Sequence, residues 1–401
     1  MVRRGRDFDE DDIRVRANPR GSRPRTKIRP TQEDAADAMV LAVDRGRYTC
    51  LIRSGERVGA EVTAMKAREL GRKGVVVGDL VSLVGDLRGG PDSLARVVRV
   101  VPRQRVLRRT ADDTDPVERV IVANADQLVI VTALADPEPR PRMIDRCLVA
   151  ALEARLPAVL CLTKADLADP TALIEAYRPL GVEVVVTRQD GDLAALRRVL
   201  AGKMSILVGH SGVGKSTLVN ALIPGADRVV GVVNDVTGRG RHTSTSAVAL
   251  RLPAMEIEVQ VAAPAQAAVG TVGAADGDDA GRLGATVPDA DFDLDDAGGL
   301  AGLAGLAGLD DLEEDVRDGV EDLPGGWVID TPGVRSFGLA HVAPDAVIAA
   351  FPDLAVITAE CPRGCTHMAD SPDCLLDEFP VDPARLDSLR RLLTALTSGD
   401  N

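Results

Sequence analysis

The stretch LVGHSGVGKSTLVN, from Leu207 to Asn220, places the pattern Gly-x4-Gly-Lys-Ser between an apolar run and a helical run. Such a pattern is a phosphate-binding loop when it follows a strand and opens a helix. Its glycines let backbone N–H groups curl around phosphate oxygens, and the helix adds its positive N-terminal end. The sequence therefore predicts a nucleotide site on Gly209, His210, Ser211, Gly212, Val213, Gly214, Lys215, Ser216 and Thr217.

Two further features of the sequence, the Lys-Ser pair that ends the loop and a later DTPG motif, support phosphate chemistry at this site. We expect Lys215 to reach the β- and γ-phosphates as a catalytic group, and Ser216 to ligate Mg²⁺. The sequence DTPG, from Asp330 to Gly333, follows another apolar run. An Asp in that place approaches Mg²⁺ through water, and the Gly N–H senses the γ-phosphate. A plain β-turn is the alternative for so short a motif.

The sequence TKAD, formed by Thr163, Lys164, Ala165 and Asp166, ends a third apolar run. Asp166 can accept two hydrogen bonds from guanine N1 and N2, a pair that adenine does not offer. Lys164 would lie along the base plane. Thr163 stands where Asn is commoner, so we expect a weaker bridge from this side chain to the phosphate loop. A helix N-cap at the end of a strand is the alternative.

The order of these motifs is unusual, because the base-reading motif normally follows the phosphate loop in the chain. Here Asp166 lies 43 residues before Gly209. Ligands bind beyond the C-terminal ends of parallel strands, so the three loops need only be neighbours in space. Because domain termini are often close together, a permuted chain can build the same site. The order predicts a circularly permuted nucleotide-binding domain.

The remaining sequence suggests several domains. Residues 36–108 hold short β-rich runs, which predict a small barrel of the OB or SH3-like type. Residues 109–345 alternate apolar strands with helical segments, which predicts an α/β domain with a mostly parallel sheet. Residues 1–35 are Arg-rich and predict a disordered arm, either a solvated tail or a segment that seeks nucleic-acid phosphates. Residues 346–401 form a small helical module.

The net charge of −13 hides an acidic insert at residues 255–322. This segment holds 18 acidic and 2 basic residues, a net charge of −16, so the rest of the chain carries +3. It is rich in Ala, Gly and Asp, and we expect most of it to be disordered. An inert loop is one interpretation of its role, and a mimic of RNA that shields a basic surface is the other.

Four residues near the C-terminus, Cys361, Cys365, His367 and Cys374, offer three thiolates and one imidazole. This set suits tetrahedral Zn²⁺, although the spacing is not that of a standard zinc finger. A redox thiol pair is the alternative, which the interposed histidine disfavours. Six cysteines in 401 residues are no disulfide scaffold and favour a reducing cytoplasm. No apolar run reaches the ~18–20 residues of a membrane span.

The motifs TKAD, GHSGVGKSTLVN, GRGRHTST, DTPGVRSFGL and the CPRGC-TH…DC cluster occur in that order. Over most of residues 36–395 the sequence resembles the circularly permuted, small-subunit-dependent GTPases of the RsgA (YjeQ) family. The resemblance implies an OB-fold barrel, a permuted P-loop GTPase domain and a C-terminal helical zinc domain. It implies GTP hydrolysis stimulated by the small ribosomal subunit during its late maturation. GTP and GDP, Mg²⁺, one Zn²⁺ per chain, the small subunit and its rRNA are the expected ligands and partners of a cytoplasmic monomer.

The segment GRGRHTST, from Gly238 to Thr245, lies where a nucleotide-sensing switch belongs, and Thr243 or Thr245 is expected to ligate Mg²⁺. Many GTPases place a water-orienting Gln directly after D-x-x-G, but here that residue is Val334. We therefore take His242 as the catalytic candidate, with a surface loop histidine as the alternative. Val334 also favours a rival function, in which an rRNA-binding module keeps GTP as a structural ligand with negligible turnover.

Overall fold

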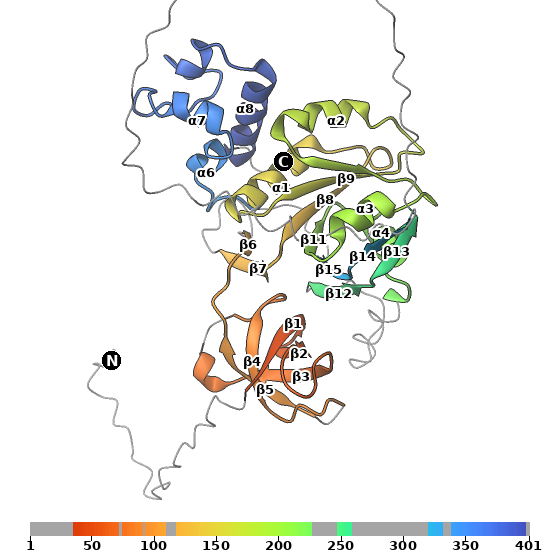
Figure 1. Cartoon of the computed structure of the whole chain (residues 1–401). Coiled ribbons are helices and arrows are strands. Elements are labelled where there is room, and N and C mark those ends of the chain that lie inside the picture. Colours follow the sequence, from red (N-terminus) through yellow and green to blue (C-terminus); the bar gives the residue numbers. More distant parts are fainter. Residues whose placement is uncertain are drawn as a thin grey trace, which may run out of the picture.

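A computed structural model describes residues 35–71, 74–90, 93–109, 118–226, 247–258, 320–331 and 338–397. Within these ranges a small β-barrel, a sheet flanked by helices and a helical module follow one another along the chain (Figure 1). The predicted N-terminal arm, apart from Ala35, and the predicted switch segment GRGRHTST both lie outside the described residues.

The first unit is a closed barrel of OB type. Its strand order is β1-β2-β3-β5-β4, and β4 returns to β1. Only β3 and β5 run parallel, and the other pairs are antiparallel. Closure leaves no free edge, so the buried side chains of all five strands share one core. Its elements are β1 (Ala36–Asp44), β2 (Arg47–Ile52), β3 (Glu61–Lys66), η3 (Arg68–Leu70), β4 (Leu80–Gly85) and β5 (Ala95–Val100).

A hairpin joins the barrel to the next unit. Strand β6 (Val106–Arg109) pairs with β7 (Arg119–Ala123), so the predicted barrel boundary at 108 falls inside this hairpin. Gly78 packs so closely here that a Cβ would lie 1.9 Å from the carbonyl oxygen of Ala123. The Asn124 side chain donates to the Gly78 carbonyl at 2.9 Å, which fixes the barrel against the hairpin.

The second unit is a six-stranded section of sheet in the order β10-β9-β8-β11-β15-β12. All neighbours run parallel except β12, the antiparallel strand, which also meets the barrel through the pair Ala42 and Val248. The strands are β8 (Gln127–Ala133), β9 (Ala158–Thr163), β10 (Glu183–Val186), β11 (Met204–Val208), β12 (Val248–Leu252) and β15 (Gly326–Asp330).

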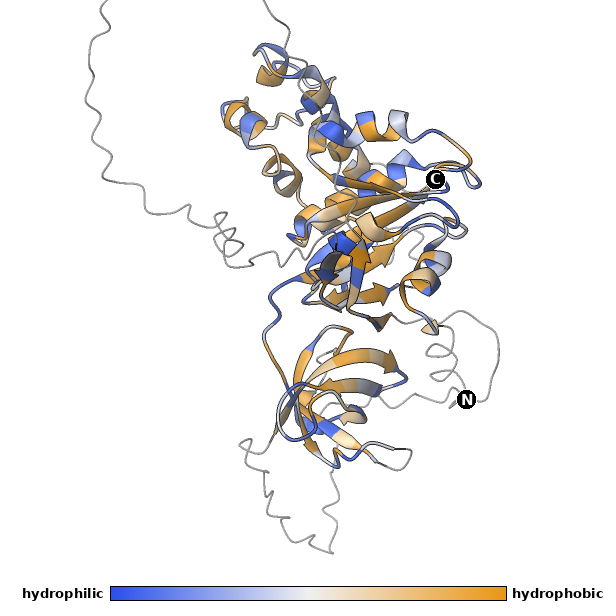
Figure 2. Cartoon of the chain, turned by 45° about the vertical axis from the view of Figure 1, so that its right-hand side comes forward, coloured by the Kyte–Doolittle hydropathy of each residue, from blue (hydrophilic) through white to orange (hydrophobic). Residues whose placement is uncertain are grey.

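Helices cover both faces of this sheet, as the near-continuous apolar character of its strands requires (Figure 2). Leu128 and Ile130 face the core with α1, whereas Val129 and Val131 face the opposite core with α3 and α4. The α/β architecture and its mostly parallel sheet are therefore confirmed. The helices are α1 (Pro141–Glu153), α2 (Thr171–Tyr177), η4 (Arg178–Leu180), α3 (Ala194–Leu200) and α4 (Lys215–Leu222).

The ends of the predicted acidic insert are ordered strands, so the boundaries at 255 and 322 are corrected. Strand β13 (Met255–Glu258) pairs with β14 (Val320–Leu323) as an antiparallel ribbon. Ile257 and Leu323 are buried together with Ala194 of α3. These apolar side chains explain why the two ends pair, while residues 259–319 lie outside the described part.

Replacing residues 259–319 by Asn-Gly should leave guanine-nucleotide affinity within about twofold of the parent. Glu258 and Val320 are partners in the ribbon, so a two-residue turn of this type can join them. Titration with a fluorescent GDP and a thermal melt would check this expectation. A large loss of affinity would show that the acidic segment supports the site directly.

The C-terminal module shares its core with the sheet domain. Leu389 and Leu392 of α8 are buried with Leu148 of α1, so α8 packs on α1. The module holds α6 (Pro344–Ile348), α7 (Pro352–Thr358), η5 (Leu375–Asp377) and α8 (Pro383–Thr397). Across the described ranges, no helix combines the length and the apolar character needed to cross a membrane.

Candidate nucleotide site and metal cluster

The phosphate loop lies between β11 and α4 at the C-terminal edge of the sheet. Gly212 and Gly214 have φ of 84° and 94°, the left-handed region that favours glycine. A Cβ on Gly209 would lie 2.3 Å from the carbonyl oxygen of Val131, so the loop start also requires glycine. The backbone can therefore turn tightly enough to direct its N–H groups toward a phosphate.

Lys215 and Asp330 form the charged centre of the site. The Lys215 ammonium donates to the Gly209 carbonyl at 2.8 Å, which places it inside the loop. Burial lowers the pKa of Lys215, and the Asp330 carboxylate opposes this shift. Burial likewise raises the pKa of Asp330, and Lys215 opposes that shift. Each charge therefore stabilises the other in a half-buried environment. The ammonium of Lys215 can also bind an anion such as a phosphate, and the carboxylate of Asp330 can also bind a metal cation.

Asp330 reaches this place because β15 runs parallel to β11, with Leu207 and Asp330 in register. The next residue, Thr331, donates its hydroxyl to the Leu207 carbonyl at 2.7 Å and holds the strand end against the phosphate loop. Ser216 and Thr217 are exposed in the first turn of α4. Gly333, His242, Thr243 and Thr245 lie outside the described residues, so their roles stay predictions.

Thr163 bonds directly to the phosphate loop, so the expected bridge between the two motifs is present. Its hydroxyl donates to the Val213 carbonyl at 2.6 Å, and the side chain is buried. The bond joins segments that lie 50 positions apart in the chain. It therefore ties the TKAD loop to the phosphate loop.

Thr163→Val should raise the Kd for GDP about tenfold, because the isostere leaves a buried Val213 carbonyl without its donor. Thr163→Asn is the matched control, since its amide can donate to the same carbonyl and should retain most of the affinity. Isothermal titration of the three proteins tests this expectation. Equal GDP affinities of the Thr163→Val protein and the parent would show that this hydrogen bond does not contribute to nucleotide binding.

The rest of the TKAD motif follows the end of β9. Lys164 has a φ of 60°, and its ammonium contacts the Asp136 carbonyl in the loop before α1. The Ala165 N–H donates to the Thr187 carbonyl at 3.1 Å. Asp166 is exposed, and its carboxylate accepts from the Gln189 N–H at 3.2 Å. The carboxylate is therefore accessible to a base.

The loop after β10 is a fourth part of the site that the sequence analysis did not name. Thr187 and Gln189 bond to the TKAD loop, as described above, and Thr187 also donates its N–H to the Leu162 carbonyl at 2.7 Å. The signal is present in the sequence, because the Val-rich run VEVVVT at residues 182–187 lies within the region predicted to alternate strands with helices. Loops that follow such strands gather at one edge.

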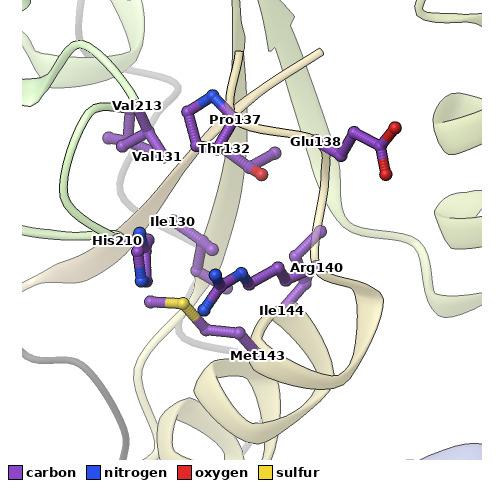
Figure 3. Close-up of a pocket in the computed structure, with 10 residues that line it drawn as sticks. All are labelled: Ile130, Val131, Thr132, Pro137, Glu138, Arg140, Met143, Ile144, His210 and Val213. Atoms are coloured by element: carbon purple, nitrogen blue, oxygen red, sulfur yellow. The ribbon is translucent and has the colours of Figure 1, made fainter. Parts of the chain in front are cut away.

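A cavity beside the phosphate loop is too small for a nucleotide. His210, Arg140 and Met143 line it, and the Arg140 guanidinium extends toward the His210 ring (Figure 3). Its volume of about 10 Å³ corresponds to roughly one water molecule. His210 Nδ1 lies 2.9 Å from the Ser211 carbonyl.

The predicted metal ligands converge in the C-terminal module. The ligand atoms of Cys361, Cys365, His367 and Cys374 all lie within 4.8 Å of one another. The Cys365 sulfur and His367 Nδ1 are 3.4 Å apart. Three sulfurs and one imidazole nitrogen at this spacing fit a tetrahedral ion that prefers soft ligands.

Comparisons with known proteins agree with this geometry. The model of the RsgA GTPase family matches residues 100–257. The small ribosomal subunit biogenesis GTPase RsgA of Pseudomonas aeruginosa strain LESB58 is 31% identical over 326 residues, covering 78% of this chain and 74% of that protein. The protein with the same name from Pseudomonas syringae pv. tomato is 30% identical, covering 84% and 83%.

Two solved structures share the fold. YjeQ from Thermotoga maritima superposes with a TM-score of 0.53 and 21% identity, covering 90% of this chain and 99% of that one. YloQ, described as a circularly permuted GTPase, gives a TM-score of 0.52 and 18% identity, covering 92% and 97%. Together with the sequence relatives, these findings show that the chain belongs to the RsgA family of circularly permuted GTPases of small ribosomal subunit biogenesis.

Proposed function

We propose that this GTPase acts while bound to the small ribosomal subunit, that the subunit accelerates GTP hydrolysis, and that hydrolysis is a switch in late maturation. The proposal that the chain binds a guanine nucleotide rests mainly on the 2.6 Å hydrogen bond from the Thr163 hydroxyl to the Val213 carbonyl. It joins base-reading and phosphate loops that the permuted chain separates. The subunit itself enters from the names of the sequence relatives, which are small ribosomal subunit biogenesis GTPases.

The phosphate loop would bind the β- and γ-phosphates through backbone N–H groups and the ammonium of Lys215. Phosphoryl transfer spreads negative charge over the γ-phosphate oxygens, so fixed donors and one ammonium lower the barrier. Ser216, at the start of α4, and Asp330, at the end of β15, present oxygens that suit Mg²⁺. Mg²⁺ bound there would neutralise charge on the phosphates as hydrolysis proceeds.

The guanine base would be read by the exposed carboxylate of Asp166. Within the part of the chain that the structure describes, this carboxylate accepts a main-chain N–H from Gln189, which leaves acceptor capacity for a base. Lys164 would lie along the base, next to the loop that precedes α1.

Asp166→Asn should lower GTP affinity about 100-fold and create measurable binding of xanthosine nucleotides. The amide reverses the donor and acceptor pattern that guanine N1 and N2 require, and the mismatch leaves polar groups unpaired. Competition between fluorescent GDP and unlabelled XDP measures both effects. Unchanged selectivity would exclude Asp166 from the base site.

The barrel would supply contacts to rRNA phosphates. Arg45, Arg47, Arg53, Arg57, Arg96 and Arg99 are exposed on it. Cations on an exposed surface bind a phosphate backbone mainly by releasing counterions, so affinity falls steeply with salt. The metal cluster would hold one Zn²⁺ and order the loop between α7 and α8.

GTP hydrolysis with and without purified small subunits is the decisive measurement. We expect stimulation of at least about tenfold, and tighter, salt-sensitive subunit binding with a non-hydrolysable GTP analogue than with GDP. Equal binding in the two nucleotide states together with negligible turnover would favour the rival function. The chain would then be an rRNA-binding module that keeps GTP as a structural ligand.

A further inference from the structure

The C-terminal helix α8 presents two adjacent arginines to different partners. Arg390 and Arg391 are neighbours in the chain, and neighbouring positions on an α-helix point about 100° apart. Arg390 bonds to the segment that carries the metal ligands, whereas Arg391 bonds to the GTPase domain. One rigid helix therefore contacts the metal loop and the nucleotide-binding domain at the same level.

Arg390 holds the metal loop on both sides of the ligand cluster. Its Nε donates to the carbonyl of the ligand His367 at 3.2 Å. Its Nη2 donates to both carboxylate oxygens of Asp377, at 2.8 and 2.7 Å, in η5 just after the ligand Cys374. His367 has a φ of 59°, an uncommon conformation for a residue with a Cβ, so an external bond to its carbonyl helps to fix it.

Arg391 holds two helices of the GTPase domain. Its Nε donates to Asp145 of α1 at 3.1 Å, and the Asp145 side chain is 3% exposed. Its Nη1 and Nη2 both donate to the Ala176 carbonyl of α2 at 3.3 Å, and its guanidinium lies 4.7 Å from the centre of the Tyr177 ring. Arg146 of α1 also donates to the Ala395 carbonyl of α8 at 2.9 Å.

The two helices that Arg391 contacts adjoin the base-reading loop. Helix α2 begins shortly after Asp166, and the Lys164 ammonium contacts the loop that leads into α1. The contacts of Arg390 and Arg391, together with the covalent chain of α1 and α2, therefore connect His367 to the TKAD loop. Such a connection can couple two sites when ligands at both sites shift the equilibrium of one element, here the packing of α8 against its neighbours.

We propose that α8 couples the metal cluster to the guanine site, so that zinc binding and guanine-nucleotide binding strengthen each other, with Arg390 and Arg391 as positioning residues. The coupling rests on the zinc and guanine sites proposed above. Binding energies linked in this way are reciprocal: zinc must raise nucleotide affinity by the factor by which the nucleotide raises zinc affinity.

The first measurement uses the full-length parent chain in excess Mg²⁺. Its Kd for fluorescent GDP is determined with zinc bound, and again after zinc removal by a chelator that prefers zinc to magnesium. We expect zinc removal to weaken GDP binding at least about fivefold, and re-addition of zinc to restore it. Transfer of zinc to a chromogenic chelator should in turn slow when GDP is added.

The second measurement locates the coupling. Arg390→Lys keeps the charge but cannot bond to His367 and Asp377 together, so zinc should be lost to the chelator about tenfold faster. In the Arg390→Lys protein, zinc removal should therefore weaken GDP binding less than it does in the parent. Arg88→Lys is the matched control, because Arg88 makes a similar paired contact with Asp86 on the exposed barrel surface. This control should retain the parent's zinc transfer and its coupling.

The outcomes separate the possible failures. A parent chain that binds no zinc would overturn the metal site and with it this inference. A chain that binds zinc and GDP, but whose GDP affinity is unchanged by zinc removal, would overturn the coupling and leave both sites standing. Full coupling in a folded Arg390→Lys protein, judged by circular dichroism, would exclude α8 as the connecting element.

Discussion

Lys215→Ala should lower kcat/KM for GTP hydrolysis by about 10²- to 10³-fold. This is the usual effect of removing one preorganised hydrogen-bond donor that stabilises the negative charge developing in the transition state. The ammonium lies inside the phosphate loop, 2.8 Å from the Gly209 carbonyl, so it is held in place before a phosphate arrives. A donor positioned in advance needs no reorganisation during the reaction. Alanine offers no donor and leaves Asp330 without its compensating charge.

Single-turnover hydrolysis measured at saturating GTP would separate lost binding from lost chemistry. Lys203→Ala is the matched control. Lys203 is an exposed lysine that precedes β11, at the end of the strand opposite to the phosphate loop. The Lys203→Ala protein should hydrolyse GTP at the parent rate. A Lys215→Ala protein that is folded and retains most of its activity would refute the catalytic role assigned to this residue.

The parts of the site that the sequence predicted follow from local rules. The glycine pattern of the phosphate loop requires particular backbone angles, which Gly212 and Gly214 adopt. The motifs TKAD and DTPG followed apolar runs, and parallel strands bring the ends of such runs to one edge. Position in space was therefore predictable although the chain order is permuted.

The parts that were missed or wrong depend on pairings between distant segments. The partner of Thr163 is a main-chain carbonyl at Val213, which no side-chain pattern reveals. The partner of Arg391 is Asp145, 246 positions away. The insert boundaries were wrong for a similar reason, because composition marks acidic residues but does not show that Ile257 and Leu323 are buried together.

The C-terminal module was expected as a separate domain, yet it shares a core with α1. Phe351, Leu389 and Leu392 are buried in the same cluster as Leu148 and Leu160. Burying apolar surface contributes about 25 cal/mol per Å², so a shared core makes separation of the units costly. A nucleotide-dependent movement of this module would therefore have to carry α1 with it, or loosen only the loops around the metal cluster.

Cys374→Ser should abolish zinc binding, from about one ion per chain to none, and unfold the loop between α7 and α8. Structural zinc sites contribute about 10–16 kcal/mol of apparent binding free energy in small domains, which exceeds what any single packing contact here can supply. Cys374 is buried, and the residues that follow it form η5, which Arg390 holds. Losing one thiolate therefore removes the ion and leaves the bond from Arg390 to Asp377 as the remaining anchor of this turn.

Metal analysis and hydrogen exchange of residues 359–382 measure the two effects. Cys50→Ser is the matched control, because Cys50 is fully buried in the barrel core and is not one of the four clustered ligands. This control should retain the zinc. Because Leu376 of η5 belongs to the core shared with α1, exchange in Cys374→Ser should rise first around the cluster and only then in α8. Zinc retained at the parent level in Cys374→Ser would show that the cluster does not hold the ion.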